Sequence, residues 1–141
     1  MNAEIRTKIV CVARNQLGKP YGYHVRIKDE MKAFDCSGLV TYCYFKAGIY
    51  LPRYTVKIID YGQIIERSEI QPADLVLFKG DGHEHPLFKN GVGHIAIYVG
   101  NDEIVEAFAE RVVVPYKEFE GAVRVRKFSD RIRDESFRSV L

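Results

Sequence analysis

The sequence predicts an α+β domain, with N-terminal helices packed on an antiparallel β-sheet. Up to about residue 50, apolar residues recur at helical spacing, and beyond about residue 70 they alternate in short runs separated by turn residues. Consecutive strands at hairpin spacing favour antiparallel pairing, with the helices segregated to one side. The 141 residues are enough to bury a core, and we predict a single domain over residues 1–141.

Two helices are predicted in the N-terminal part. The first covers residues 3–17, with Asn2 as its N-cap and Gly18 after its end. The second covers residues 36–47 and ends at Gly48. Its later turns are almost entirely apolar, which is typical of a buried, central helix. The apolar positions of the first helix are Ile5, Ile9, Val10, Val12, Ala13 and Leu17.

Short strands are predicted after the helices. The glycine-rich segment 79–93 is interpreted as a loop, and a mobile flap over a cleft is the favoured role. Residues 129–141 are predicted to form either a short helix or a loose tail. The predicted strands cover residues 74–78, 94–99, 103–108, 112–114 and 122–128.

Composition and charge indicate which partners and which cellular compartment to expect. The net charge of +2 gives no support for a nucleic-acid partner. Three cysteines without disulfide-like spacing favour a reducing compartment. No signal-peptide pattern is visible and no apolar run approaches roughly 18 residues, so we expect no membrane span. These features predict synthesis in the cytoplasm, with phage association or a non-classical route for any action outside the cell.

Cys36 is the first candidate for chemistry. It lies between Asp35 and the run Ser37-Gly38, directly before an apolar helix. A thiol at a helix N-terminus faces unpaired backbone N–H groups and the positive end of the helix dipole, which favour the reactive thiolate. The Asp35 carboxylate opposes that ionisation, so a nearby imidazolium must outweigh it. Most unpaired cysteines are small buried hydrophobes, and that interpretation suits Cys11 and Cys43.

His94 is the candidate base for this thiol. It begins an alternating strand, on the face that Ala96 and Tyr98 share, while Ile95 and Ile97 point the other way. The imidazole would take the proton of Cys36 and later deliver it to a leaving amine. The alternative is a structural, hydrogen-bonded histidine.

A catalytic histidine needs a group that orients its second nitrogen, and hairpin register offers Glu106. A three-residue loop at residues 100–102 sets Val99 opposite Glu103 and Ala96 opposite Glu106, which places Glu106 on the His94 face. A two-residue loop would instead set Glu106 opposite Ile97, on the wrong face. A solvated strand carboxylate is the alternative role for Glu106.

Four segments together resemble the NlpC-type cell-wall cysteine peptidases. The resemblance implies a papain-like fold and hydrolysis of bacterial peptidoglycan stem peptides, often between D-γ-glutamate and a diamino acid. It implies a cysteine, a histidine and a third polar residue, and neither a metal nor another cofactor. The segments are Gly-Lys-Pro-Tyr (18–21), Phe-Asp-Cys-Ser-Gly-Leu-Val (34–40), Gln-Pro-Ala-Asp-Leu-Val-Leu-Phe (71–78) and Gly-His-Ile-Ala-Ile-Tyr-Val-Gly (93–100).

Carried onto this chain, the resemblance makes Cys36 the nucleophile and His94 the base. Glu106 stands where the family often has a histidine as its third residue. Tyr21 matches a tyrosine close to the nucleophile. Asp35 and Ser37 match positions that line the pocket for the free N-terminus of a stem peptide, so the partner implied is a stem peptide or muropeptide.

The sequence departs from the family pattern in two places, of which the first concerns the geometry of the catalytic residues and the second concerns substrate preference. The third catalytic position is a glutamate, and residues 21–25 (Tyr-Gly-Tyr-His-Val) lack the tryptophan and second glycine that usually follow the family tyrosine. Two other functions therefore stay open: an amidase or acyl hydrolase of the same fold, or a non-catalytic phage- or wall-associated binding domain. The sequence does not indicate an oligomeric state.

Two further clusters of residues lie outside these motifs. A zinc site at His83, His85 and His94 is disfavoured because His94 is required as the base. The basic residues between 124 and 133 are interrupted by acidic ones, so we interpret them as a solvated face.

Overall fold

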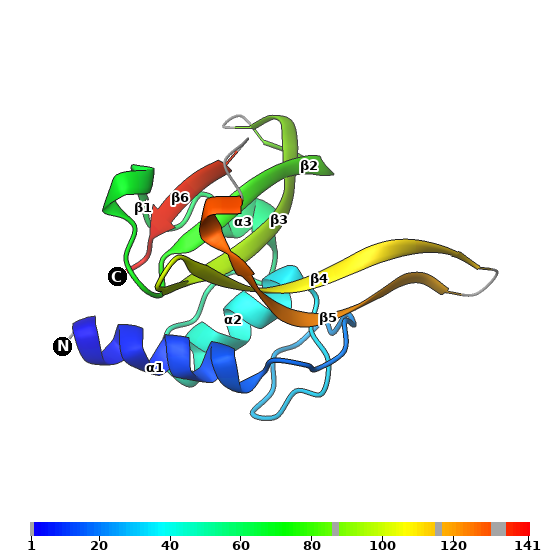
Figure 1. Cartoon of the computed structure of the whole chain (residues 1–141), viewed down its shortest axis with the longest axis horizontal. Helices are drawn as coiled ribbons and strands as arrows, with labels where there is room; N and C mark the ends of the chain where they lie inside the picture. The colour runs from blue at the N-terminus through cyan, green and yellow to red at the C-terminus, as the bar shows by residue number, and fades with distance from the viewer. Residues whose placement is uncertain (1, 86–87, 115–116, 131–134) are drawn as a thin grey trace.

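A computed structural model of the chain describes residues 2–85, 88–114, 117–130 and 135–141, with side chains described for 2–79, 93–109, 121–130 and 136–141. Two helices lie against one side of a sheet (Figure 1). They are α1 (Asn2–Asn15) and α2 (Cys36–Lys46), followed by the short α3 (Thr55–Ile58). The predicted helices are confirmed, although α1 already includes Asn2, which was predicted to be its cap.

The sheet is antiparallel and its described strands follow the order β1-β6-β2-β3-β4-β5. The chain visits the strands in hairpins from β2 to β5, and β6 then returns to lie between β1 and β2. The α+β class predicted from the sequence is therefore confirmed. The strands are β1 (Gln63–Ile65), β2 (Leu75–His85), β3 (Phe88–Gly100), β4 (Glu103–Val114), β5 (Lys117–Lys127) and β6 (Glu135–Ser139); 3-10 turns cover Arg67–Glu69 (η1) and Phe128–Asp130 (η2).

Two predictions about strands were wrong. Residues 79–85 and 88–93 are not a loop but the ends of β2 and β3, because backbone pairing continues through the glycines with shifts of register. In the C-terminal segment, residues 135–139 form neither a helix nor a tail but β6, which pairs with both β1 and β2. β6 was not predicted because apolar and polar residues do not alternate along it. The strand buries Arg138 next to Phe137.

The two faces of the sheet have separate cores. Ile95, Ile97 and Val99 of β3 join the main core with residues of α1 and α2. Ala96 packs on the opposite face with Val76, Phe78, Ile104, Phe128 and Phe137. α2 contacts β3 and β4, and α1 contacts α2 and β3, so α2 is the central helix that the sequence predicted.

The β3–β4 hairpin has the predicted register but a different turn. Asn101 and Asp102 both adopt positive φ (53° and 60°) in a two-residue connection between the paired residues Gly100 and Glu103. A β-bulge between Tyr98 and Gly100 adds one residue on β3, so Ile97 faces Val105 as predicted. The expected pairing of Val99 with Glu103 was wrong. The bulge compensates for the shorter turn, which keeps Glu106 on the His94 face.

Among the described residues, no helix is long and apolar enough to cross a membrane.

A buried ion pair ties α1 to the start of β2. Arg6 Nη1 lies 2.7 Å from Asp74 Oδ1, and the two side chains are 11% and 2% exposed. Asp74 Oδ2 also accepts a hydrogen bond from the backbone N–H of Gln71. We expect Asp74→Asn to lower the free energy of unfolding by about 3 kcal/mol, because it leaves a mostly buried guanidinium without its counter-charge. Urea denaturation followed by circular dichroism measures this loss.

The exposed pair of Arg14 with Glu103 is the matched control, since it also joins α1 to the sheet and its side chains are 37% and 36% exposed. Arg14→Ala should cost less than about 1 kcal/mol. If Asp74→Asn and Arg14→Ala lowered the free energy of unfolding equally, burial would not be the reason that the Arg6–Asp74 pair matters for stability.

Candidate active site

Cys36 is the first residue of α2 and is partly exposed. Asp35 is the N-cap, and its Oδ1 accepts a hydrogen bond of 2.7 Å from the Gly38 N–H. The cap keeps the helix start ordered and leaves the thiol at the end of the helix, where the dipole favours its anion. The predicted placement of Cys36 is confirmed.

His94 of β3 and Glu106 of β4 are in direct contact. His94 Nε2 lies 2.7 Å from Glu106 Oε1, and Glu106 is fully buried. The imidazole ring packs between Phe78 and Phe108, with ring centroids 5.5 and 6.4 Å away. These contacts fix the ring on both sides, so the hairpin register delivers the pair that the sequence predicted.

Arg124 completes this arrangement from β5. Glu106 and Arg124 are cross-strand partners, and Arg124 Nε donates to Glu106 Oε2 over 2.9 Å. Arg124 was predicted to lie on a solvated face; its side chain is 36% exposed, but its Nε is paired with the buried carboxylate of Glu106. The contact of Arg124 with Glu106 depends on the pairing of β4 with β5. The sequence pattern predicted two short strands in place of β4 and did not predict the register of β4 with β5.

The electrostatics of the site favour an ion pair between thiol and imidazole. Burial by itself would raise the pKa of Cys36, but the hydrogen bond and charge of His94 outweigh burial and the opposing charge of Asp35, so the pKa is lowered. Burial would lower the pKa of His94, but its bonds to Cys36 and Glu106 raise it to about 9. At neutral pH, His94 is therefore protonated, and its charge favours the thiolate form of Cys36.

Glu106 stays ionised despite its burial. Burial would raise the pKa of its carboxyl, but the hydrogen bonds and charges of His94 and Arg124 lower it. A buried carboxylate with two charged partners gives the imidazolium a fixed counter-charge.

Tyr21 lies beside the nucleophile. Its segment joins the edge of the sheet, because Tyr21 N–H donates to the Gly121 carbonyl and Gly22 N–H donates to the Phe34 carbonyl. Burial, followed by the nearby charges of Cys36 and Asp35, raises the pKa of Tyr21 to about 12. The phenol is thus an O–H donor next to Cys36, as the family resemblance implied.

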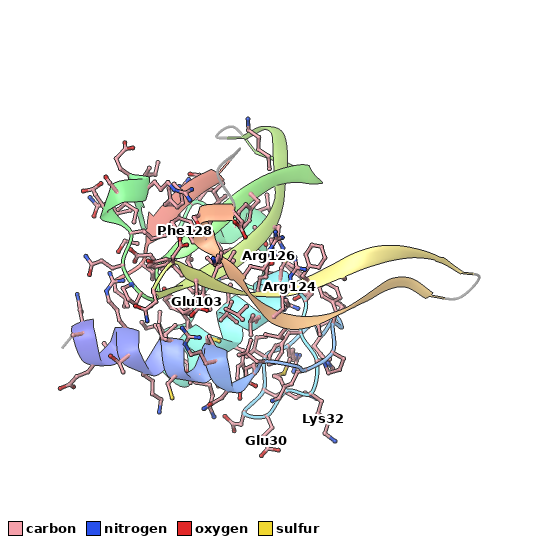
Figure 2. The ribbon with its side chains drawn as sticks, viewed as in Figure 1. Glu30, Lys32, Glu103, Arg124, Arg126 and Phe128 are labelled. Carbon is pink, nitrogen blue, oxygen red and sulfur yellow. The ribbon has the colours of Figure 1, made fainter. Side chains whose placement is uncertain are left out.

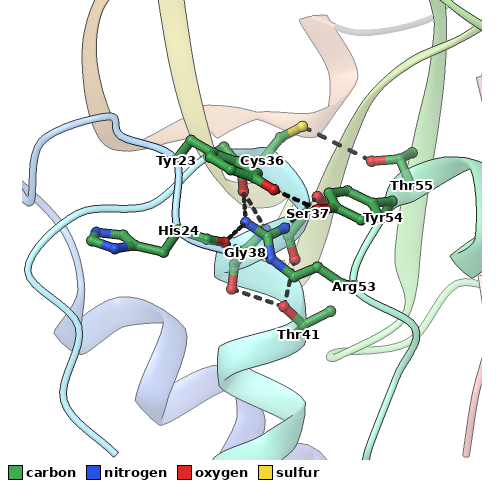
Figure 3. A network of polar contacts seen from close by, with 10 residues as sticks. Tyr23, His24, Cys36, Ser37, Gly38, Thr41, Arg53, Tyr54 and Thr55 are labelled. Carbon is green, nitrogen blue, oxygen red and sulfur yellow. Dashed lines mark hydrogen bonds and ion pairs between the residues drawn. The ribbon is translucent and has the colours of Figure 1, made fainter. Parts of the chain in front are cut away.

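Asp35 and Ser37 share a partner that the sequence analysis missed. Arg53 donates through Nη2 to Asp35 Oδ1 (3.0 Å) and through Nη1 to Ser37 Oγ (2.9 Å), and Ser37 is only 3% exposed (Figure 3). Within the part of the chain that has described side chains, both hydrogen bonds to the Asp35 carboxylate end on Oδ1, so Oδ2 is the oxygen left for a ligand. Arg53 follows α2 in an irregular segment, where no periodic pattern could indicate its partners.

Two tyrosines flank this guanidinium. The rings of Tyr23 and Tyr54 stack, and their hydroxyl groups are 2.5 Å apart. The guanidinium carbon of Arg53 lies 5.3 and 5.2 Å from the two ring centroids (Figure 3). Tyr23 belongs to the segment that departs from the family pattern, and Thr55, next to Tyr54, places Oγ1 3.9 Å from the Cys36 sulfur.

Two other groups of residues lie away from this centre or outside the described side chains. Glu30 and Lys32, on the polar connection between α1 and α2, extend to the periphery of the molecule (Figure 2). The side chains of His83 and His85, which the zinc alternative requires, lie outside the described part of the chain.

Comparisons with known proteins agree with this fold. The family model of the NlpC/P60 family matches residues 18–131. Gamma-DL-glutamyl hydrolase of Bacillus subtilis is 34% identical over 110 residues, covering 77% of this chain and 25% of that protein. The chain spans only 17% to 25% of the length of the curated relatives it matches.

Solved structures show the same fold. The P60 domain of an antigen from M. avium paratuberculosis aligns with a TM-score of 0.73 at 21% identity, covering 99% of this chain and 95% of that one. RipD from Mycobacterium tuberculosis, described as a non-catalytic NlpC/p60 domain protein adapted to peptidoglycan binding, aligns with a TM-score of 0.71 at 20% identity, covering 97% and 98%. The papain-like α+β fold is thereby confirmed, and the chain belongs to the NlpC/P60 family.

Proposed function

We propose that this chain is a cysteine endopeptidase that hydrolyses peptidoglycan stem peptides at the bond between γ-D-glutamate and a diamino acid. The observation that carries the proposal is the linked set of Cys36, His94 and Glu106, with the thiol at a helix N-terminus and the imidazole held by a buried carboxylate. The γ-D-glutamyl bond is supported by the resemblance and by the name of the Bacillus subtilis relative.

The proposed reaction begins with attack of the Cys36 thiolate on the scissile carbonyl carbon. The backbone N–H of Cys36 and the O–H of Tyr21, which lie close to each other, are proposed to donate to the developing oxyanion. The protonated His94 then gives its proton to the leaving amine, and the acyl group stays on sulfur. His94, now neutral, accepts a proton from water, which attacks the thioester and releases the acid.

Asp35 is proposed to bind the free N-terminal ammonium of the stem peptide through Oδ2. Ser37 supports this subsite indirectly, because it is buried and holds Arg53. Direct contact of Ser37 with the substrate would require Arg53 to move. Tyr21, on the other side of Cys36, is proposed to contact the scissile carbonyl.

A binding-only role is the competing function, because RipD shares the fold without catalysis. In this chain the imidazole is hydrogen-bonded to a buried carboxylate and lowers the pKa of the cysteine, which a purely binding role would not need. An acyl hydrolase with a different substrate would use the same centre and differ only in the peptides it cleaves.

The first prediction concerns thiol reactivity. Cys11, which was predicted to be buried, is exposed. In a Cys11→Ser background, iodoacetamide should label Cys36 rapidly at pH 6, because His94 lowers the pKa of its thiol, whereas buried Cys43 should stay unlabelled. Mass spectrometry of the digested protein identifies the labelled residue. In His94→Ala, the labelling rate at pH 6 should fall at least about tenfold, since a shift of one pKa unit changes the thiolate fraction tenfold. Slow labelling of Cys36 in the unsubstituted enzyme would contradict a catalytic role.

The second prediction ranks the catalytic residues. Cys36→Ala should abolish release of the N-terminal dipeptide from an L-Ala-γ-D-Glu-diaminopimelate tripeptide without changing the melting temperature. His94→Ala should cost about 10³-fold or more in kcat, and Glu106→Gln about 10²-fold, because the glutamine keeps an oxygen but loses the counter-charge. Chromatography of the products measures each rate. If Glu106→Gln were more damaging than His94→Ala, the assigned order of roles would be wrong.

The third prediction concerns the alkaline limit of activity. Because contact with Cys36 and Glu106 raises the pKa of His94 to about 9, the imidazolium that protonates the leaving amine is present below that pH and lost above it. The kcat/KM for the N-acetylated tripeptide, which has no titrating amine, should therefore hold from neutral pH to about 8.5 and fall as pH rises through about 9. A decline of kcat/KM centred near pH 6.5, the usual pKa of histidine, would show that Cys36 and His94 do not form an ion pair.

The fourth prediction tests the ammonium subsite. Acetylation of the N-terminal amine of the tripeptide should lower kcat/KM about 10- to 100-fold, the value of a charge-assisted hydrogen bond. Asp35→Asn is the matched variant, because asparagine preserves helix capping but removes the charge. This variant should no longer distinguish the free from the acetylated peptide. A preference that survives in Asp35→Asn would place the ammonium elsewhere.

A further inference from the structure

We propose that Arg124 is a positioning residue of the active site: it orients the Glu106 carboxylate toward His94 and sets the pH range in which Cys36 and His94 form their ion pair. The inference rests on the proposed function only in taking Cys36 as the nucleophile. It does not depend on which peptide is cleaved.

The geometry assigns one oxygen of Glu106 to each partner. Oε1 contacts His94 Nε2 at 2.7 Å, and Oε2 accepts from Arg124 Nε at 2.9 Å. A carboxylate bound at both oxygens cannot rotate about its terminal bond without losing a partner. Arg124 therefore fixes the plane in which Glu106 presents Oε1 to the imidazole.

The Arg124 side chain is itself held in place. Its guanidinium carbon lies 3.6 Å from the centroid of the Phe108 ring, a cation–π contact. Phe108 also packs edge-on against the His94 ring. The same phenylalanine thus contacts both partners of Glu106, which couples the position of the guanidinium to that of the imidazole.

The charge of Arg124 balances that of Glu106. The charged and titratable groups around this centre come from each neighbouring segment: Cys36 and its cap Asp35 from α2, Tyr21 from the segment before it, His94 from β3 and Arg124 from β5. Without Arg124, the Glu106 carboxylate would act on His94 and Cys36 with its full negative charge. Loss of a nearby cation raises the pKa of every such group, because it disfavours thiolate formation and favours the imidazolium.

The test is the pH dependence of Cys36 alkylation and of tripeptide hydrolysis in Arg124→Gln, which keeps a hydrogen-bond donor but removes the charge. The acidic limb of the alkylation profile and both limbs of the hydrolysis profile should move to higher pH by roughly half a unit, a fraction of the shift caused by a directly paired ion. At pH values below the acidic limb, alkylation should therefore be about threefold slower than in the unsubstituted enzyme. The Cys11→Ser background leaves Cys36 as the reactive thiol.

Two further variants separate charge from shape. Arg124→Lys keeps the cation and should leave both limbs in place. Arg126→Gln is the matched control, since Arg126 lies two residues along β5 and pairs with Ile104 rather than with Glu106 (Figure 2). Its profile should match that of the unsubstituted enzyme, and melting temperatures establish that each variant is folded.

The inference is overturned if the limbs of Arg124→Gln coincide with those of the unsubstituted enzyme, or if Arg126→Gln shifts them as much. A loss of rate that is equal at every pH would assign Arg124 a structural role only. If Arg124→Gln does not fold, a shift of both limbs in Arg124→Lys would equally overturn the role of charge. If the proposed function is wrong, the result is different: no stem peptide is cleaved, but the acidic limb of Cys36 alkylation in Arg124→Gln still moves to higher pH.

Discussion

The buried carboxylate of Glu106 is the constraint on which the rest of the site depends. A fully buried charge destabilises a fold unless charged or hydrogen-bonding partners compensate for its lost hydration. Here one partner comes from each neighbouring strand, His94 from β3 and Arg124 from β5. Any slip of register in either hairpin would leave this charge unpaired, so the energetic requirement of Glu106 fixes the alignment of three strands. The same alignment places the imidazole where the thiol of α2 can reach it.

The ionisation of the Cys36 thiol depends on opposing electrostatic effects. The α2 N-terminus and His94 favour the thiolate, whereas burial and the Asp35 carboxylate disfavour it. Asp35 stays close because it caps the helix that carries the nucleophile, and Arg53 reduces its effect by binding the same oxygen. A guanidinium thus accompanies each carboxylate of the site, Arg53 at Asp35 and Arg124 at Glu106. This pairing lets two anions lie near a third, the thiolate, without suppressing its formation.

The sequence predicted the parts of this site that local rules control. The cysteine at a helix start, the alternation that directs His94, and the face occupied by Glu106 all follow from periods of 3.6 and 2 residues. The two arginines were not predicted because each meets its carboxylate through long-range packing. Arg53 depends on how an irregular segment folds over α2, and Arg124 on the register of β5. The turn was also mistaken, yet a bulge restored the predicted register, because the burial of alternate residues constrains register more strongly than turn length does.

The choice of glutamate as the third residue has a consequence for the sheet. A neutral third residue would orient the imidazole with a hydrogen bond alone and would need no cation on the next strand. Glutamate adds a counter-charge that raises the pKa of His94, but its burial then requires Arg124, and Arg124 in turn needs Phe108 to hold it. In this chain the glutamate is therefore part of a set that also includes Phe108 on β4 and Arg124 on β5. Replacing Glu106 by histidine alone would leave the Arg124 guanidinium and the His94 imidazole without their counter-charge, so a histidine at this position would require Arg124 to change as well.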